Sequence, residues 1–171
     1  MSRFRLRTLR LRPGEEHREQ LEVTLEPLRF GGEAYEPTPR VAPADLVIQR
    51  ASSGDVFWLR FATRLDGPCV RCLAPASLPI EIDAQEYQAR EPDGEEELRS
   101  EYVVEGELDV GAWARDQLAL EVPDQVLCRP DCAGLCPVCG KDLNVEPHGH
   151  DAPETDPRWA ALEALRADPS E

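Results

Sequence analysis

The sequence has no apolar stretch close to the roughly 20 residues that a helix needs to cross a lipid bilayer. The arginines near its start are not followed by an apolar segment of the kind found in signal peptides. It also lacks the glycine-rich loops that bind nucleotide phosphates and the Gly-x-Ser-x-Gly turn of serine hydrolases. We therefore expect a cytoplasmic protein that has no contact with membranes and no small-molecule substrate.

Positive charge is scarce: 34 acidic residues stand against 19 lysines and arginines, giving a net charge of −15. The charge is uneven, because residues 1–50 hold nine arginines and eight acids, whereas residues 81–121 hold fourteen acids and three arginines. Such an acidic excess repels nucleic-acid phosphates at long range. The acidic block is typical of a solvated surface, and it also suits docking to a basic protein.

The first 88 residues show the alternation of strands. Residues 19–26 place Leu21, Val23 and Leu25 on one side, and similar patterns predict strands over 45–50, 56–65 and 78–83. Glycine and proline clusters separate these segments. The sequence therefore predicts a mainly β protein of the α+β class, with a small antiparallel sheet or a barrel-like domain.

Two short helices are predicted after the sheet. Asp109 is a suitable N-cap for a helix that ends near Leu120, and Asp156-Pro157 is a suitable start for a second one. Residues 89–100 have the composition of a polar loop, and 102–104 suit a further short strand. We expect a core domain over 1–125, a cysteine- and histidine-containing segment with zinc-binding loops over 126–155, and a terminal helix over 156–171.

Eight closely grouped cysteine and histidine residues are candidate metal ligands. Because disulfides rarely persist inside cells, such cysteines more often bind metal. Two pairs have the Cys-x-x-Cys spacing of a zinc knuckle, a third pair is four residues apart, and two histidines follow closely. These residues are Cys69, Cys72, Cys128, Cys132, Cys136, Cys139, His148 and His150. They suffice for two zinc ions with four ligands each, although spacing alone leaves their division between sites open.

The segment from Pro130 to Asn144, PDCAGLCPVCGKDLN, is similar to the C-terminal signature of the YceD family of large ribosomal RNA subunit accumulation proteins. The upstream Asp66-Gly67 and the segment from Cys69 to Leu73 resemble the same family, as does the segment from Asp156 to Trp159. The resemblance implies a non-catalytic accessory role in large-subunit biogenesis that supports 23S rRNA accumulation. It also implies a ribosomal protein or a large-subunit assembly factor as the partner.

The resemblance also implies a division of the ligands. Family members that lack the Cys-Pro-x-Cys-Gly segment keep the first Cys-x-x-Cys pair and a pair near 128 and 132. One site would then contain Cys69, Cys72, Cys128 and Cys132, and the other Cys136, Cys139, His148 and His150. The alternative joins the two Cys-x-x-Cys pairs, as in a zinc ribbon.

Three other functions compete with this interpretation. His17-x-Glu19 and the later Pro-Cys-x-x-Cys match the zinc-deaminase pattern, but His17 precedes a strand pattern and Cys69 lies in a turn, so we expect no enzyme. A redox Cys-x-x-Cys would open a helix, which neither pair does. Direct rRNA contact is the third alternative, because arginines alternate with apolar residues near the N-terminus, at Arg3, Arg5, Arg7, Arg10 and Arg12. Arginines that keep a strand edge soluble give the same pattern.

Overall fold

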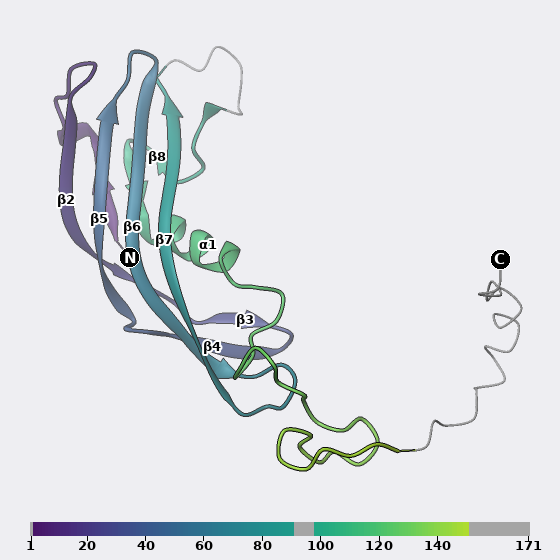
Figure 1. Cartoon of the computed structure of the whole chain (residues 1–171). Helices are drawn as coiled ribbons and strands as arrows, with labels where there is room; N and C mark the ends of the chain where they lie inside the picture. The colour runs from purple at the N-terminus through teal and green to yellow at the C-terminus, as the bar shows by residue number, and fades with distance from the viewer. Residues whose placement is uncertain (1, 91–97, 151–171) are drawn as a thin grey trace, which may run out of the picture. The chain divides into compact units, whose positions relative to one another are not determined.

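The computed structural model describes residues 2–90 and 98–150, and within them it is built mainly from antiparallel strands. Two compact units follow each other along the chain, Met1–Cys132 and Ala133–Glu171. The first contains all the named strands and the helix (Figure 1). The boundary between the two units lies between Cys132 and Ala133. No described helix is long and apolar enough to cross a membrane.

The larger sheet has six strands in the order β2-β5-β6-β4-β3, with β7 paired to β6. Its strands are β2 (Glu16–Thr24), β3 (Leu28–Phe30), β4 (Glu33–Thr38), β5 (Val41–Arg50), β6 (Gly54–Pro68) and β7 (Pro75–Ala89). One edge of β6 pairs first with β5 and then with β4, whereas its other edge pairs with β7 over all 15 residues. The mainly β fold is confirmed, as an open sheet.

The observed strands extend beyond the predicted ranges: β5 starts four residues before the expected 45–50, and β7 extends the expected 78–83 in both directions. Pro43 lies inside β5, but the recorded pairing of β5 with β6 begins at Ala44. Pro79 lies in β7, which pairs with a single named strand, β6. A missing N–H therefore costs little at Pro79, whereas Pro43 is accommodated in register with Glu22 of β2. Gly67 stays in β6 because the ring of Tyr35 fills the space where a side chain would lie, 2.3 Å from an added Cβ.

The smaller sheet joins the N-terminus to the region before the helix, in the order β1-β9-β8. Its strands are β1 (Arg3–Arg5), β8 (Val103–Val104) and β9 (Glu107–Asp109). The N-terminal arginine alternation does not produce a long strand, because the chain turns into a 3₁₀ helix, η1 (Leu6–Thr8), directly after β1. Arg10 and Arg12 therefore lie outside this sheet.

The helix α1 (Val110–Leu120) covers part of one face of the larger sheet (Figure 1). Asp109 caps it as predicted, accepting a hydrogen bond from the Ala112 amide at 3.0 Å. Trp113 and Leu118 are fully buried, as are Phe57 and Leu59 of β6. The described residues contain this single α-helix, and the predicted helix from Asp156 lies outside them.

Candidate metal centres

The first cluster lies at the end of the long β6–β7 hairpin. Cys69 and Cys72 belong to the turn between these strands, where the Cys69 amide donates to the Ala74 carbonyl at 2.8 Å and the Leu73 amide donates to the Cys69 carbonyl at 3.0 Å. Leu73 adopts a positive φ of 62°, which lets the turn close. This tight turn directs two thiols to the same side.

The segment after α1 supplies the other two thiols of this cluster. The Val70 amide donates to the Val126 carbonyl at 3.0 Å, which holds the segment against the hairpin turn. The four sulfur atoms of Cys69, Cys72, Cys128 and Cys132 all lie within 4.8 Å of one another. Cys69 and Cys132 are almost completely buried, and Cys128 is the most exposed of the four. Although a spacing of four residues suits one turn of helix, bends and turns connect Cys128 to Cys132.

Arg71 connects the two halves of this cluster. Its guanidinium donates to the Cys132 carbonyl at 3.0 Å and to Oε1 of Gln125 at 2.9 and 3.1 Å. Arg129, the other arginine beside a cysteine, forms an ion pair with Asp131 at 3.4 Å. An arginine near four sulfur atoms offsets part of the negative charge that accumulates when the thiols ionise.

The thiol pKa values show how these four groups affect one another. Burial raises the pKa of Cys69, but amides of Cys128, Cys72 and Arg71 outweigh it and lower the pKa to about 6. The hydrogen bond with Cys72, followed by burial, raises the pKa of Cys128 to about 12. The Cys69 thiolate is thus stabilised, whereas the raised pKa values of Cys72 and Cys128 show that these two thiols resist ionising beside it. A divalent cation removes this conflict, since it allows all four sulfur atoms to be thiolates.

The second cluster lies in the unit that begins at Ala133. Cys136 and Cys139 lie in a knuckle closed by hydrogen bonds from the Gly140 amide to the Cys136 carbonyl and from the Cys136 amide to the Lys141 carbonyl, both 2.8 Å. Gly140 has a φ of 73° with open space around it, so backbone conformation accounts for glycine here.

Two histidines complete this second group. The ligand atoms of Cys136, Cys139, His148 and His150 lie within 4.8 Å of one another. Nε2 of His148 is 3.1 Å from the Cys139 sulfur, and its Nδ1 is 2.7 Å from the Glu146 carbonyl. A carbonyl bonded to Nδ1 fixes the tautomer that presents a lone pair at Nε2 to a metal. The Cys139 amide does most to lower the pKa of Cys136, which is about 6.

The geometry thus divides the eight candidate ligands into sets of four thiols and of two thiols with two imidazoles. Both are donor sets of structural zinc sites, and both fill a tetrahedral shell. The zinc-ribbon pairing of the two Cys-x-x-Cys motifs does not occur among the described residues.

His17 lies far from the first cluster, which excludes the deaminase arrangement. It pairs with Ile48, and Ile48 pairs with Phe57. The twelve residues of chain from Phe57 to Cys69 correspond to roughly 40 Å of extended strand. The His17 imidazole instead contacts Glu19 at 3.1 Å and lies against the ring of Phe4.

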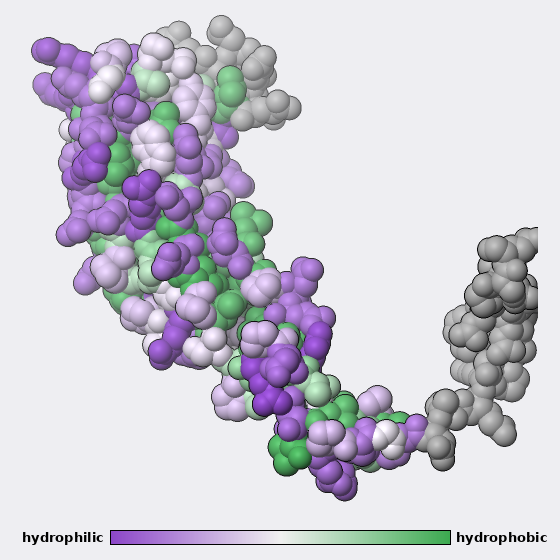
Figure 2. Space-filling model, viewed as in Figure 1, coloured by the Kyte–Doolittle hydropathy of each residue, from purple (hydrophilic) through white to green (hydrophobic). Residues whose placement is uncertain are grey.

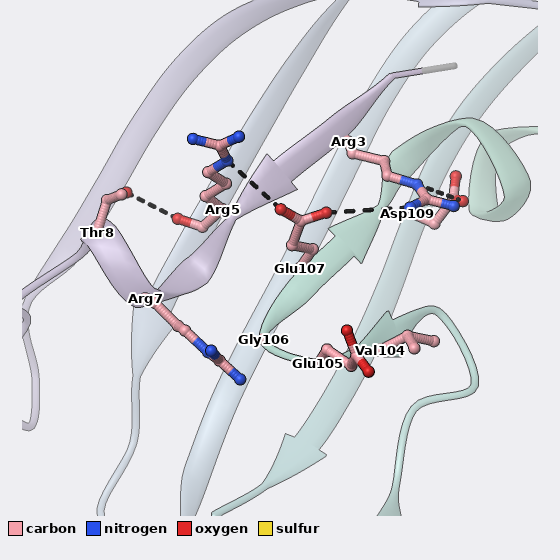
Figure 3. A pocket seen from close by; sticks show the side chains of 9 residues that line it. All are labelled: Arg3, Arg5, Arg7, Thr8, Val104, Glu105, Gly106, Glu107 and Asp109. Atoms are coloured by element: carbon pink, nitrogen blue, oxygen red, sulfur yellow. Dashed lines mark hydrogen bonds and ion pairs between the residues drawn. The ribbon is translucent and has the colours of Figure 1, made fainter.

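The N-terminal arginines line a separate hollow of about 370 Å³ (Figure 3). Arg3, Arg5 and Arg7 reach it, but Arg10 and Arg12 do not. Arg3 pairs with Asp109 at 3.3 Å, and Arg5 pairs with Glu107 at 3.4 Å. With Glu105 also present, three carboxylates balance three guanidinium groups. Sequence reasoning missed these carboxylates because β9 and the turn before it lie about 100 residues away along the chain.

These features define a mainly β protein with two four-residue candidate metal centres. The family model for the large ribosomal RNA subunit accumulation protein YceD matches residues 59–166, which include both clusters. The chain belongs to the YceD family. The family's name implies a role in the accumulation of large-subunit ribosomal RNA.

The similar curated proteins are bacterial and plant. An uncharacterized protein of Mycobacterium tuberculosis strain H37Rv is 36% identical over 69% of this chain and 58% of its own length. The uncharacterized protein YlbN of Bacillus subtilis is 31% identical over 57% of this chain and 58% of its own length. The chloroplastic large ribosomal RNA subunit accumulation protein YCED homolog 1 of Zea mays is 42% identical over 22% of this chain and 13% of its own. The chain spans about 58% of the mycobacterial relative. No solved structure matches it significantly.

Proposed function

We propose that this protein is a non-catalytic zinc-binding factor that supports the accumulation of 23S rRNA in the cytoplasm, through a ribosomal or assembly-factor protein. The observation that carries the proposal is the grouping of eight ligands into two complete sets of four. A catalytic zinc keeps a coordination position open for water, whereas four thiolates, or two thiolates and two imidazoles, fill the shell. Family membership supplies the biological process.

Zinc in the first cluster would tie distant parts of the chain together. Fifty-five residues separate Cys72 from Cys128, so a metal bound by both pairs closes a long loop. Because the unfolded chain has no preformed site, the binding free energy of the metal adds to the stability of the fold. The metal would then maintain the structure on which a partner binds.

Direct contact with rRNA through the N-terminal arginines is the alternative, and the hollow in Figure 3 favours it. RNA phosphates would have to displace the carboxylates that already pair with Arg3 and Arg5. This competition and the net charge of −15 both favour a protein partner over RNA.

Deletion of the gene tests the proposed function. We expect the ratio of 23S to 16S rRNA to fall, and free large subunits to decrease in sucrose gradients. A wild-type copy should restore the ratio, and a Cys69→Ser copy should restore it less well, because the metal supports the fold. Unchanged subunit profiles in the deletion strain, including at low temperature, would contradict the proposed role.

A further inference from the structure

The face of the larger sheet opposite α1 is uncovered in the described residues. Along the middle of β5, β6 and β7, buried residues alternate with exposed or half-buried ones, and α1 contacts the sheet at β2 and β7. Figure 1 views this face, with α1 behind the strands, and Figure 2 shows hydrophilic residues mixed with apolar ones over it. We call it the outer face.

A shallow hollow of about 610 Å³ lies on the outer face and has an apolar floor. Pro43 of β5 and Ala62 of β6 contribute to this floor. A second hollow adjoins it, with Val47 and Trp58 in its lining beside Arg18, and the two hollows share Asp45 and Arg60. Apolar surface of this kind accepts the methylene groups of long side chains.

Carboxylates surround this floor. Glu81 pairs with Ala62 across the β6–β7 ladder, Glu22 pairs with Pro43 across the β2–β5 ladder, and Asp45 lines both hollows. No ion pair of Glu22 or Glu81 is recorded within the described residues. Asp45 accepts a hydrogen bond from Gln20 at 3.0 Å and lies across the β5–β6 ladder from Arg60. The remaining acid, Asp83, holds Arg60 at 2.9 Å.

We propose that the outer face, centred on Pro43 and Ala62, binds an extended, lysine- or arginine-rich segment of a partner protein. The aliphatic parts of its basic side chains would lie on the apolar floor, and their cationic ends would meet Glu22, Asp45 and Glu81. The charge excludes RNA, since the larger hollow holds three carboxylates and one guanidinium that is already paired. This inference rests on the proposed function for the biological setting, but the surface itself is argued from contacts and charge.

A pair of matched triple variants tests the surface. Glu22→Gln, Asp45→Asn and Glu81→Gln remove three charges from the outer face, whereas Glu26→Gln, Glu101→Gln and Glu121→Gln remove three exposed charges elsewhere. The probe is a short labelled peptide of alternating lysine and valine, followed by fluorescence anisotropy. We expect the first triple variant to bind about tenfold more weakly and the second to bind within about twofold of the parent, since the net charge of the two variants is equal.

A third variant separates a local site from general electrostatic attraction. Ala62→Lys places a cation and a long side chain on the floor, so it should abolish most binding of the peptide while the circular dichroism spectrum stays unchanged. Equal weakening by both triple variants would overturn the proposal, as would an unaffected Ala62→Lys protein. Tighter binding of labelled oligouridine than of the peptide, sensitive to Ala62→Lys, would replace the protein segment with RNA and also overturn it.

The same variants in the deletion strain keep the two proposals apart. If deletion lowers 23S rRNA and the outer-face variant fails to restore it while the control variant does, both are supported. If deletion has no effect on 23S rRNA, the proposed function fails, but the peptide measurements still decide whether the outer face binds basic segments. If the outer-face variant restores 23S rRNA fully, the docking inference fails and the rRNA role stands.

Discussion

Cys69 and Cys139 occupy Cys-x-x-Cys pairs of the same spacing, but their surroundings differ. Cys69 is completely buried at the end of β6, whereas Cys139 is exposed. Loss of a buried ligand weakens metal binding and leaves the buried thiols of Cys72 and Cys132 without it. We expect Cys69→Ser to lower the melting temperature of the zinc-loaded protein by roughly 10 °C, corresponding to a few kcal/mol.

Cys139→Ser is the matched control, measured by thermal circular dichroism at the wavelength of the sheet signal. It should lower zinc content without moving the main transition by more than about 2 °C, since the ligand lies in the second unit. A Cys69→Ser protein that melts like the parent would show that the metal has no structural role.

At the level of single residues, spacing predicted which side chains form the two clusters, but not which hydrogen bonds hold the clusters together. The paired Cys-x-x-Cys motifs are local features, so the sequence shows them directly. The bonds of Arg71 to Gln125 and to the Cys132 carbonyl span more than 50 residues and depend on how the segment after α1 returns to the hairpin turn. No pattern in a single sequence indicates such a contact.

Among the elements, the segment 133–150 forms a knuckle with its own hydrogen bonds. The Leu143 amide donates to the Gly134 carbonyl at 2.9 Å, and Asn144 accepts from the Ala133 amide at 2.8 Å. We expect the double variant His148→Ala with His150→Ala to lose one zinc ion while unit 1 keeps its fold. Elemental analysis after gel filtration gives the zinc content, and near-ultraviolet circular dichroism reports on the buried Trp113.

The single variant His17→Ala is the control for this experiment, because it removes a histidine outside both clusters. It should keep the full zinc content. If the double variant also keeps it, the two histidines are not ligands, and the zinc-ribbon pairing of Cys-x-x-Cys motifs gains support.

Element type was easier to predict than element length. The alternation of apolar residues predicted the strands, and Asp109 predicted the start of α1, because both signals are local in sequence. β6 and β7 extend to 15 residues because they pair with each other along their whole length, which offsets the unfavourable Gly67 and Pro79. The turn of η1 interrupts the arginine alternation because the Leu6 amide bonds to the Gly106 carbonyl, a partner from the smaller sheet.

At the scale of the whole molecule, the two clusters differ in burial. Three cysteines of the first cluster are buried, whereas only Cys136 is buried in the second. Exposed ligands allow a chelator or an oxidant to reach the metal, and thiolate access largely determines such reactivity. The two centres should therefore release metal at different rates, although their ligand number is equal.

We expect the purified protein to contain close to two zinc ions and to release them in two phases to a coloured chelator such as 4-(2-pyridylazo)resorcinol. The fast phase should belong to the exposed cluster, so Cys139→Ser should remove it and leave the slow phase intact. The slow phase should coincide with loss of the sheet's circular dichroism, because the first metal holds together segments 55 residues apart. A reproducible content near one zinc ion would contradict the two-site arrangement, and a single release phase in the parent would contradict the difference in access between the clusters.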